Sequence, residues 1–548
     1  MSCMTGKNSM MITKTIERKK PHDHSLFCML LISIFLLLAT RLITVRHNMN
    51  LHPDEPVFYR AADSLMHFME GTGDSFEEVK EYPEGAIVLQ MPFHIAADIL
   101  RCFTSIDLSM RLCSRLASVF YFTLGAVLGI IIEYRFLGKN KRSTIAYSAI
   151  LLLSIMHIEQ SRYGTGDAIS LFLTMGILYF SAAGEKTERR EKLRCWLVAG
   201  FLTGLLCAVK YPLLFWGLIP IIAALKTEGL QRREKVNIVI LFMVTVTVGF
   251  LFISPKTAVD PCYILRTVKR ELQAYVLEAN ITEVGGPLNH FLSLTIYSLL
   301  YSGFPLAPVF FAASINERNQ PSKNDYQHSF ILDKLLPSLI VVFFLYNLFS
   351  KTMFMRNVYP FFFLSDLYVA EYLGKYHSKK ERAILCILGS FFLLRGIYYI
   401  GVLTENRGAG RLEYMVSQAA DKSWSQTTLL NTTYSVAINT EKLIGPKKAD
   451  LFGSEYDNNS EMLLEYGEMV ITGQIEFYRG TGYFFPVNNQ LANQYVERWK
   501  TFKQVNCEYF VGAVYPMHYY YLFGYWIKGT GGASSEFPTN YVYYRGAE

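Results

Sequence analysis

The chain has 548 residues, of which 51% are hydrophobic and 18% charged, with a formal net charge of +7. The apolar residues gather in runs of about 20, the length that crosses the hydrocarbon core of a bilayer. The basic residues cluster in the short segments between these runs, where positive charge orients a membrane protein, so the net charge does not indicate nucleic-acid binding. The nine cysteines form no CxxC pair and no Cys/His spacing, so they indicate neither a zinc site nor a disulfide framework.

The first apolar run is expected to be a retained membrane span. Residues 1–24 are polar and basic and are interpreted as a cytoplasmic tail, and the run at 25–46 is longer than a signal-peptide core, with no small-residue cleavage pattern after it. Further apolar stretches bring the predicted bundle to about eleven transmembrane helices. These stretches lie at 112–134, 143–158, 166–184, 195–209, 211–225, 236–254, 291–312, 333–350, 356–373 and 382–403.

The basic connections between the spans predict their orientation. An odd number of spans puts the two termini on opposite sides of the membrane. With the basic tail inside, the connections assigned to the cytoplasm carry nearly every basic cluster, as the positive-inside rule requires. They are Arg135–Arg142, Glu185–Arg194, Lys226–Lys235, Ile315–Lys334 and Gly374–Arg382. The outer face then receives the loop 47–111, a segment near 255–290 and residues 404–548.

The chain is predicted to divide into a membrane module at 25–403 and an extracytoplasmic soluble α/β domain at 404–548. Residues after 404 are rich in Tyr, Asn, Gly and Thr and contain no run long enough to span a membrane. Strands are expected at Glu468–Ile471 and Tyr509–Tyr515. Within the membrane module, Asp260–Ala279 has apolar residues at helical spacing with basic residues between them, which predicts a helix lying flat at the membrane surface.

Two adjacent carboxylates open the first outer loop, in the sequence HPDEPVFY from residue 52. Glycosyl transfer to a hydroxyl needs a base for the acceptor's proton, and a carboxylate at the headgroup level is placed to take it, so Asp54 and Glu55 are candidate catalytic residues. The alternative is a helix start, in which Asp54 caps a helix over Glu55–Phe68. Taken alone, the pair favours the helix start.

A second polar segment, Glu159–Asp167, joins the third and fourth predicted spans on the outer side. Charges at membrane depth are costly and usually face the interior of a bundle or a cavity. Arg162 therefore either pairs with Glu159 or Asp167 for structural reasons, or it lines a substrate pocket with them. The sequence supports both interpretations equally.

Three further cations, Lys210, Lys351 and Arg356, are predicted at the outer ends of spans. If the leaving group is a polyprenyl phosphate, basic side chains at that level would stabilise its negative charge. Ordinary extension of a long side chain to the interface explains any single one of them more simply. Asp366 and Arg395 lie within predicted spans and are expected to be structural.

Taken together, these features resemble the GT-C glycosyltransferases, in particular the branch of protein O-mannosyltransferases and lipid A aminoarabinose transferases. Asp54-Glu55 followed by Tyr59 resembles the family's signature in its first loop. Ser161-Arg162-Tyr163 with Asp167 is similar to an outer turn of that family. Further matching positions are Lys210-Tyr211 and Arg356 with Tyr359-Pro360. The resemblance covers roughly residues 25–400.

The resemblance implies transfer of a monosaccharide from a polyprenyl- or dolichyl-phosphate carrier, with Asp54 as general base and inversion at the anomeric carbon. It also implies sugar or acceptor contacts for Tyr59, Tyr82, Glu84, Arg162, Tyr163 and Asp167. Some relatives carry a lysine before paired prolines where this chain has Tyr82-Pro83-Glu84-Gly85, which shifts carrier-phosphate binding toward Lys210, Lys351 and Arg356. Glu84 would meet the sugar or a cation, and dependence on a divalent cation is left open.

Two other functions are compatible with the sequence. A transporter or flippase for lipid-linked saccharide would also have many spans and buried charge, but it usually places polar residues near mid-membrane on broken helices and often shows an internal repeat. A catalytically silent scaffold would use the carboxylates only as helix caps. For an enzyme, a protein, a lipid glycan and a wall polymer all remain as acceptors.

Overall fold

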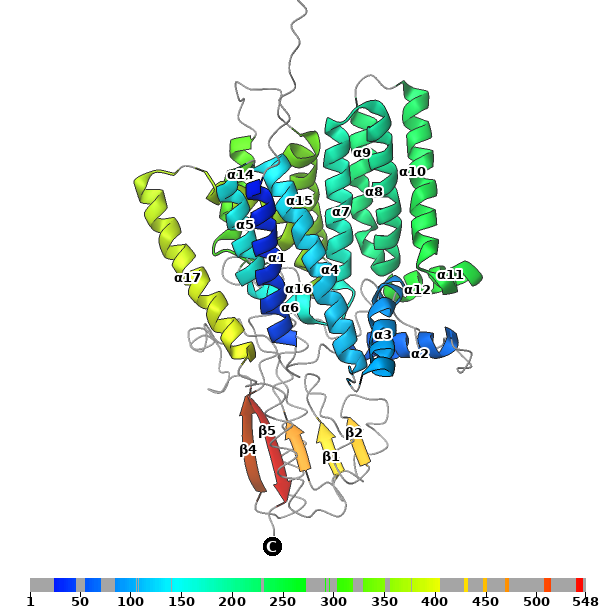
Figure 1. Ribbon diagram of the computed structural model, residues 1–548, viewed down its shortest axis with the longest axis vertical. Helices are drawn as coiled ribbons and strands as arrows, with labels where there is room; N and C mark the ends of the chain where they lie inside the picture. Colours follow the sequence, from blue (N-terminus) through cyan, green and yellow to red (C-terminus); the bar gives the residue numbers. More distant parts are fainter. Residues whose placement is uncertain are drawn as a thin grey trace, which may run out of the picture.

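The computed structural model describes, apart from short gaps, residues 24–45, 55–69, 84–272, 303–318, 329–349 and 355–404, together with five strands between residues 428 and 545. The described helical part is a bundle (Figure 1). Its long helices are α1 (His24–Val45), α4 (Met110–Ile132), α7 (Asp167–Lys186), α8 (Arg189–Val209), α10 (Arg232–Phe252), α16 (Met355–Leu373) and α17 (Lys379–Thr404).

Seven helical stretches among the described residues are long and apolar enough to cross a membrane. They are Leu26–Val45, Gly85–Phe103, Met110–Leu137, Asp167–Lys186, Arg190–Val209, Arg232–Phe252 and Ile331–Phe349. Six of the seven coincide with predicted spans, and Gly85–Phe103 falls in the predicted outer loop. A multi-pass helical membrane protein is thus confirmed, whereas the number of eleven spans stays a prediction.

Of the other predicted spans, 356–373 and 382–403 correspond to the continuous helices α16 and α17, whereas three have less regular structure or lie partly outside the described residues. The stretch 143–158 is divided at Ser154 into α5 (Lys141–Leu153) and α6 (Ile155–Arg162), and 211–225 begins with the 3₁₀ helix η2 (Tyr211–Gly217) before α9 (Leu218–Lys226). Most of 291–312 lies outside the described residues. The helix α14 (Ala307–Arg318) begins at its end, and the π-helical turn η5 (Ile331–Leu335) leads into α15 (Leu336–Phe349).

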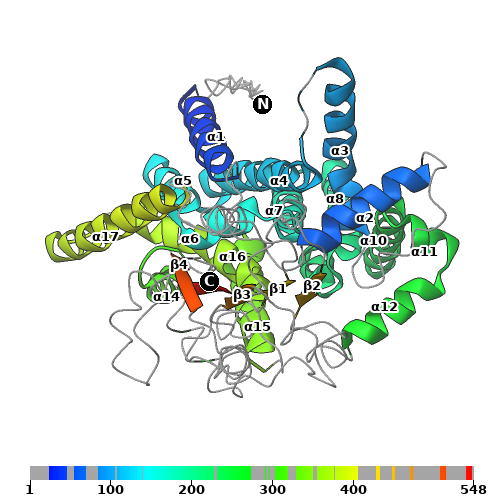
Figure 2. The same ribbon diagram turned by 90° about the horizontal axis from the view of Figure 1, so that it is seen from below.

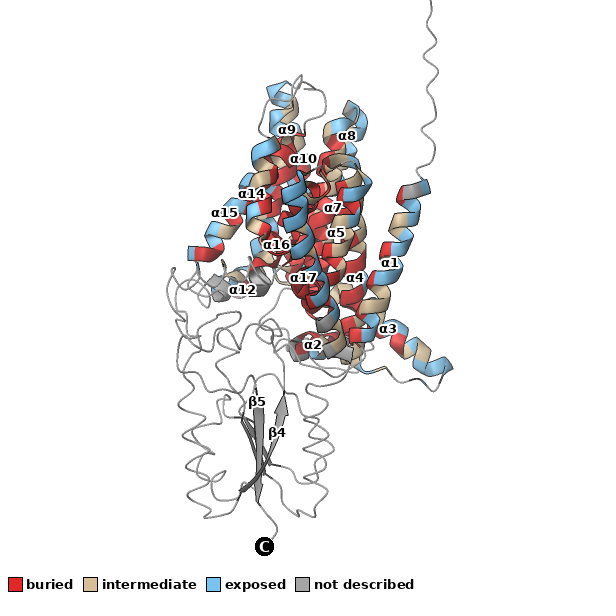
Figure 3. Cartoon of the chain, turned by 90° about the vertical axis from the view of Figure 1, so that its left-hand side faces the viewer, coloured by how far each residue is buried: buried red, intermediate tan, exposed pale blue. Residues whose placement is uncertain are grey.

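Buried residues face the interior of the bundle and exposed residues lie along the outer faces of its helices (Figure 3). Phe27 and Phe35 of α1, Phe252 of α10 and Ile387 of α17 are among the large apolar side chains that are exposed. An exposed apolar surface of this extent is stable only against hydrocarbon, so these helix faces are expected to contact lipid.

The helix bundle has two ends. The one at which α1 stops and α2 begins is named the α2 end, and the opposite one is named the far end. The helices α2 (Glu55–Met69), α3 (Gly85–Phe103), α11 (Pro255–Val259) and α12 (Cys262–Leu272) lie across the α2 end (Figure 2). Although α3 has the composition of a span, it runs across the bundle rather than along it (Figures 2 and 3). This arrangement favours the predicted surface loop over an additional span.

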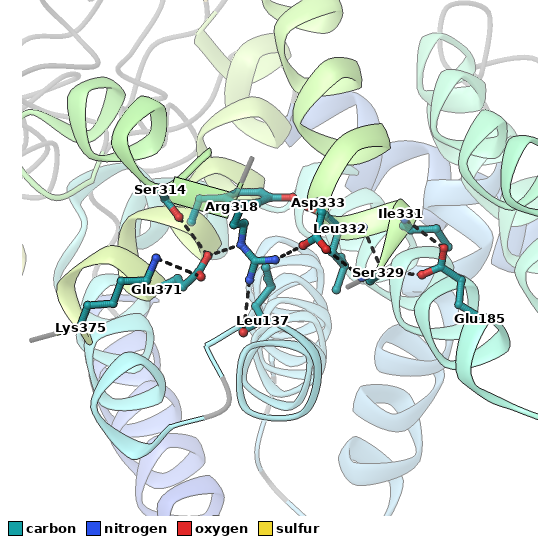
Figure 4. Close-up of polar contacts among 11 residues, drawn as sticks. Leu137, Glu185, Ser314, Arg318, Ser329, Ile331, Leu332, Asp333, Glu371 and Lys375 are labelled. Carbon is teal, nitrogen blue, oxygen red and sulfur yellow. Dashed lines mark hydrogen bonds and ion pairs between the residues drawn. The ribbon is translucent and has the colours of Figure 1, made fainter. Parts of the chain in front are cut away.

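A buried ionic network joins several helices at the far end (Figure 4). Arg318 donates to Glu371 (Nε to Oε2, 2.6 Å), to Asp333 and to the backbone carbonyl of Leu137 (3.2 Å). Leu137 ends the π-helical turn η1 (Glu133–Leu137), and Asp333 lies in η5. One guanidinium therefore links α14, α16 and both π-helical turns. The predicted basic connections, where described, share this end (Figure 1); the side of the membrane that it faces stays a prediction.

The C-terminal strands form one mixed sheet near the α2 end (Figure 1). The strands are β1 (Thr428–Asn431), β2 (Lys447–Asp450), β3 (Met469–Thr472), β4 (Cys507–Ala513) and β5 (Thr539–Arg545), in the order β2-β1-β3-β5-β4. The pairs β1–β2 and β1–β3 are parallel, and β3–β5 and β4–β5 are antiparallel. Two of the strands, β3 and β4, overlap the predicted ones. The rest of the predicted α/β domain lies outside the described residues.

Candidate active site

The first outer loop is fixed to the bundle through Glu55, the first residue of α2. Its carboxylate is buried and forms a bidentate pair with Arg115 of α4, with Nε to Oε1 and Nη2 to Oε2 both at 2.8 Å. The backbone N–H of Gly164 also donates to Oε1, at 2.7 Å. Charge-assisted bonds of this geometry are among the strongest in proteins. Glu55 therefore fastens the start of α2 to α4 and to the turn between α6 and α7.

Sequence reasoning missed Arg115, which lies 60 positions from Glu55. A signal was available, because Arg115 falls inside the predicted span 112–134, and an ionisable residue there usually has a specific partner. The predicted helix start at Glu55 is confirmed, since α2 covers Glu55–Met69. Asp54, directly before it, lies outside the described residues.

The turn between Arg162 and Asp167 is held from two sides. The amide nitrogen of Gln90 on α3 lies 3.4 Å from the carbonyl oxygens of Gly164 and Thr165, and Ser118 of α4 donates to the same Thr165 carbonyl at 3.4 Å. A Cβ atom at Gly164 would lie 2.8 Å from Ser114 Cβ, closer than real Cβ atoms approach. Glycine is therefore required for the turn to pack against α4.

Asp167 ends this turn and is the first residue of α7. Its Oδ1 atom lies 2.9 Å from Nζ of Lys210, at the end of α8, and Thr165 donates to Oδ2 at 2.9 Å. The Lys210 side chain is 25% exposed, whereas the Asp167 side chain is buried at 8%. The sequence placed both residues at the outer ends of spans but did not pair them.

Arg162 combines a structural contact with unused hydrogen-bonding groups. Its Nη2 donates to the hydroxyl of Tyr163 at 3.3 Å and lies 3.6 Å from Glu159 Oε1, and the Tyr163 hydroxyl donates to Glu159 Oε2 at 2.7 Å. The expected pairing of Arg162 with Glu159 is therefore present. Within the described part of the chain, however, Nε and Nη1 of the buried Arg162 have no hydrogen-bond acceptor. Both sequence interpretations of this residue remain open.

Glu84 lies at the start of α3, close to the end of α8. A Cβ atom at Gly85 would lie 2.7 Å from the backbone carbonyl of Ala208, so glycine permits this close approach two residues before Lys210. Glu84 is buried; its Oε2 accepts the backbone N–H of Lys256 at 2.8 Å, whereas Oε1 has no partner among the described residues. Burial raises the pKa of the Glu84 carboxyl to about 7, against the smaller opposing effect of the Lys256 N–H. This group therefore titrates near neutral pH.

Of the other predicted site residues, the structure describes Tyr59 and the backbone of Arg356. Tyr59 lies on α2 and is half-buried, whereas Tyr82 and Lys351 lie outside the described residues. Arg356 is the second residue of α16, and its side chain is not described. No group of three or more His, Cys, Asp or Glu side chains in the described ranges could hold a metal ion.

Comparison with known proteins supports the sequence resemblance. The family model of dolichyl-phosphate-mannose-protein mannosyltransferases matches residues 91–258, which include Arg115, the 162–167 turn and Lys210. The structure of ArnT from Cupriavidus metallidurans bound to undecaprenyl phosphate aligns with a TM-score of 0.52 and 12% identity, covering 83% of this chain and 94% of ArnT. The resemblance to the GT-C glycosyltransferases is confirmed.

The GT-C likeness at this low identity is a likeness of fold. The apo structure of the same ArnT aligns with a TM-score of 0.49 and 11% identity, covering 95% of this chain and 98% of ArnT. No curated protein matches the chain by sequence. The chain shares the fold of the ArnT structure bound to undecaprenyl phosphate, and its activity is inferred from its own site.

Proposed function

We propose that this chain is an integral-membrane glycosyltransferase. It moves a monosaccharide from a polyprenyl- or dolichyl-phosphate carrier to a hydroxyl of an acceptor at the α2 end. The observation that carries this proposal is the contact of Glu55 with Arg115 and Gly164, which joins the first-loop acid pair to the turn that ends at Asp167. Asp167 in turn pairs with Lys210 at the end of α8. The similar ArnT structure contains undecaprenyl phosphate, a carrier of the proposed class.

Asp54 is the proposed general base. It directly precedes Glu55, and consecutive Cα atoms are about 3.8 Å apart, so its backbone is tethered to the Glu55–Arg115 pair. Glu55 is already bound by two N–H groups of Arg115 and the N–H of Gly164, so it suits positioning rather than proton transfer. The acceptor oxygen attacks the anomeric carbon, the bond from that carbon to the phosphate oxygen breaks, and the acceptor's proton passes to Asp54. A single displacement of this kind inverts the anomeric carbon.

Lys210 is proposed to bind the carrier phosphate as it leaves. An ammonium group has three N–H donors, and among the described residues one of them is bound, by Asp167, so the other two are proposed to bind phosphate oxygens. Lys351 and Arg356 are proposed to assist, and Tyr59, Tyr82, Glu84, Arg162, Tyr163 and Asp167 to contact the sugar or acceptor. The α2 end and residues 404–548 would face the outside, with the N-terminus in the cytoplasm.

One observation favours transport of a lipid-linked saccharide as the second candidate function. The helix pair α5–α6 is broken at Ser154 inside the bundle, and the buried Arg41, His157 and Asp366 lie around the break. Broken helices with buried polar groups are common in transporters. Against this candidate, the charged residues of the proposed site, Glu55, Asp167 and Lys210, lie at the α2 end rather than at the break.

The two functions differ in whether the donor is consumed. Purified protein in lipid nanodiscs is offered a panel of polyprenyl-phosphate sugars with candidate acceptors, and the released polyprenyl phosphate is measured. The proposal expects one donor to be consumed and its sugar to appear on an acceptor. If no donor is consumed, the same panel is tested in vesicles, where movement of an intact donor across the bilayer supports the transport candidate.

A further inference from the structure

The helix α6 carries the candidate site on its last residues. It has eight residues, all of them buried, and Glu159 and Arg162 lie in its final turn. The Tyr163–Asp167 turn follows directly. The position of this turn therefore depends on the contacts that hold α6 within the bundle.

The break before α6 is stabilised by a buried side chain. Ser154 has extended backbone angles (φ −64°, ψ 125°), so α5 ends there and its last carbonyls lose their helical partners. Arg41 of α1 donates from Nη2 to the Leu151 carbonyl at 2.6 Å and from Nη1 to the Leu152 carbonyl at 3.2 Å. Because uncompensated carbonyls are costly inside a membrane, Arg41 makes the break stable. The backbone can therefore change direction at Ser154 without leaving the last carbonyls of α5 unpaired.

His157 fastens α6 to α16 through both nitrogens of its ring. Nε2 lies 2.9 Å from Asp366 Oδ2 and Nδ1 lies 3.2 Å from the Tyr359 hydroxyl, and the imidazole packs against Phe363 at 5.1 Å between ring centroids. The three partners are spaced by four and three residues, so they form one face of α16. In the neutral imidazole, Nε2 donates to the carboxylate and Nδ1 accepts from the tyrosine hydroxyl. This contact is buried on both sides.

The two helices lead to different parts of the proposed site. On α16, Arg356 precedes Tyr359 by three residues, so this proposed phosphate ligand is one turn from the His157 contact. On α6, Gln160 follows His157 by three residues, and its buried Oε1 has no partner within the described part of the chain. One turn beyond His157, a polar group on α6 is therefore available to a ligand.

We propose that the His157–Asp366 pair, supported by Tyr359, is a positioning device that sets the distance between the Tyr163–Asp167 turn and the start of α16. The inference rests on the proposed function, in which the turn lies beside the sugar and acceptor while α16 contributes to binding the carrier phosphate. His157 and Asp366 touch no reacting group. They act by fixing the position of α6 along α16, because a buried polar contact between two helices can select one register between them.

The test compares variants that remove or retain the contact. His157→Phe and Asp366→Asn abolish it, whereas His157→Gln keeps an N–H group near the position of Nε2. Tyr368→Phe is the matched control, because Tyr368 lies on the same helix, is buried and donates to the Leu332 carbonyl at 2.6 Å, away from the α2 end. Initial rates of sugar transfer give kcat and KM for the donor, and thermal unfolding reports folding in the same nanodiscs.

Small misplacements of reacting groups cost up to about 100-fold in rate, so His157→Phe and Asp366→Asn are expected to lower kcat at least ~10-fold with little change in KM. The double variant should be no slower than the slower single variant, because both changes remove one contact. His157→Gln should retain most activity, and Tyr368→Phe should keep the wild-type kcat even where it lowers the unfolding temperature.

Several results would overturn the positioning role. Wild-type kcat in folded His157→Phe and Asp366→Asn would show that the pair does not set the site, and an equal loss in Tyr368→Phe would show only general packing. In either case the wild-type protein transfers sugar and the proposed function stands. An absence of transfer by wild type with every donor would instead remove the proposed function and this inference together.

Discussion

The Nζ atom of Lys210 lies 2.9 Å from Oδ1 of Asp167, which joins the end of α8 to the start of α7. The lysine side chain is 25% exposed and the aspartate side chain 8%, so the carboxylate holds the ammonium in place while part of the lysine side chain remains exposed. A cation held in one place by a carboxylate is preorganised to bind a second anion.

Replacing Lys210 by methionine should weaken donor binding. Hydrogen bonds to charged groups contribute about 1.5–3 kcal/mol, so KM for the donor should rise on the order of 10-fold or more. Lys210→Arg should retain part of the affinity because it keeps the charge. Lys226→Met, at the end of α9, serves as the control. Unchanged kcat and KM in Lys210→Met would show that Lys210 does not bind the carrier phosphate.

Replacing Arg115 alone should destabilise the protein more than replacing Arg115 and Glu55 together. Arg115→Met leaves the Glu55 carboxylate buried without its main partner, at an expected cost of about 3–5 kcal/mol. In the Glu55→Gln and Arg115→Met double variant no charge remains unpaired, so part of the stability should return. Thermal unfolding of the three variants measures this coupling. Additive losses would contradict a direct Glu55–Arg115 interaction.

A methyl group at Gly164 should disturb the turn. In Gly164→Ala the new Cβ would lie 2.8 Å from Ser114 Cβ, and overpacking of this kind costs about 1–3 kcal/mol. The expected result is a lower unfolding temperature together with reduced transfer. Gly389→Ala on α17 is the matched control, because no atom lies within 4 Å of its added Cβ. If both variants behave alike, the close approach of the turn to α4 is not required.

The pKa of Glu84 predicts a specific pH dependence of stability. Its folded-state pKa of about 7 is above the ordinary value of 4.5, so between these values the folded protein binds a proton that the unfolded chain has lost. Stability relative to Glu84→Gln should therefore fall as the pH rises from about 4.5 to about 7, and should level off above that. Unfolding temperatures of both proteins across this range give the difference. Parallel curves would show that the Glu84 carboxyl is not perturbed.

The sequence predicted the elements that depend on local patterns. The length of the apolar runs identified α1, α4, α7, α8 and α10, and proline followed by acidic residues identified the start of α2. The turn before α7 was found because charged residues between two apolar runs are unusual. These features are visible in a short window of residues.

Other features depend on contacts between distant residues. The partner of Glu55 lies 60 positions away, and several arginines in the chain would have been equally acceptable candidates. The break at Ser154 has no glycine or proline beside it, and it is stabilised by Arg41, 110 positions from Leu151. The composition of α3 suits both a span and a surface helix, so only its packing on the turn and α4 distinguishes them.

The central claim, that the first-loop acid pair supplies the base for sugar transfer, is tested most directly with Asp54→Asn. Once a donor is identified, transfer by wild type, Asp54→Asn and Asp63→Asn is measured in the same nanodiscs. Asp63 lies on α2 beside His67 and is substantially exposed, so its variant makes the same chemical change away from the proposed site. General-base catalysis contributes about 10²- to 10⁴-fold to a reaction rate. The rate of sugar transfer should therefore fall at least about 100-fold in Asp54→Asn and stay at the wild-type value in Asp63→Asn. Full transfer by a folded Asp54→Asn protein would contradict the account.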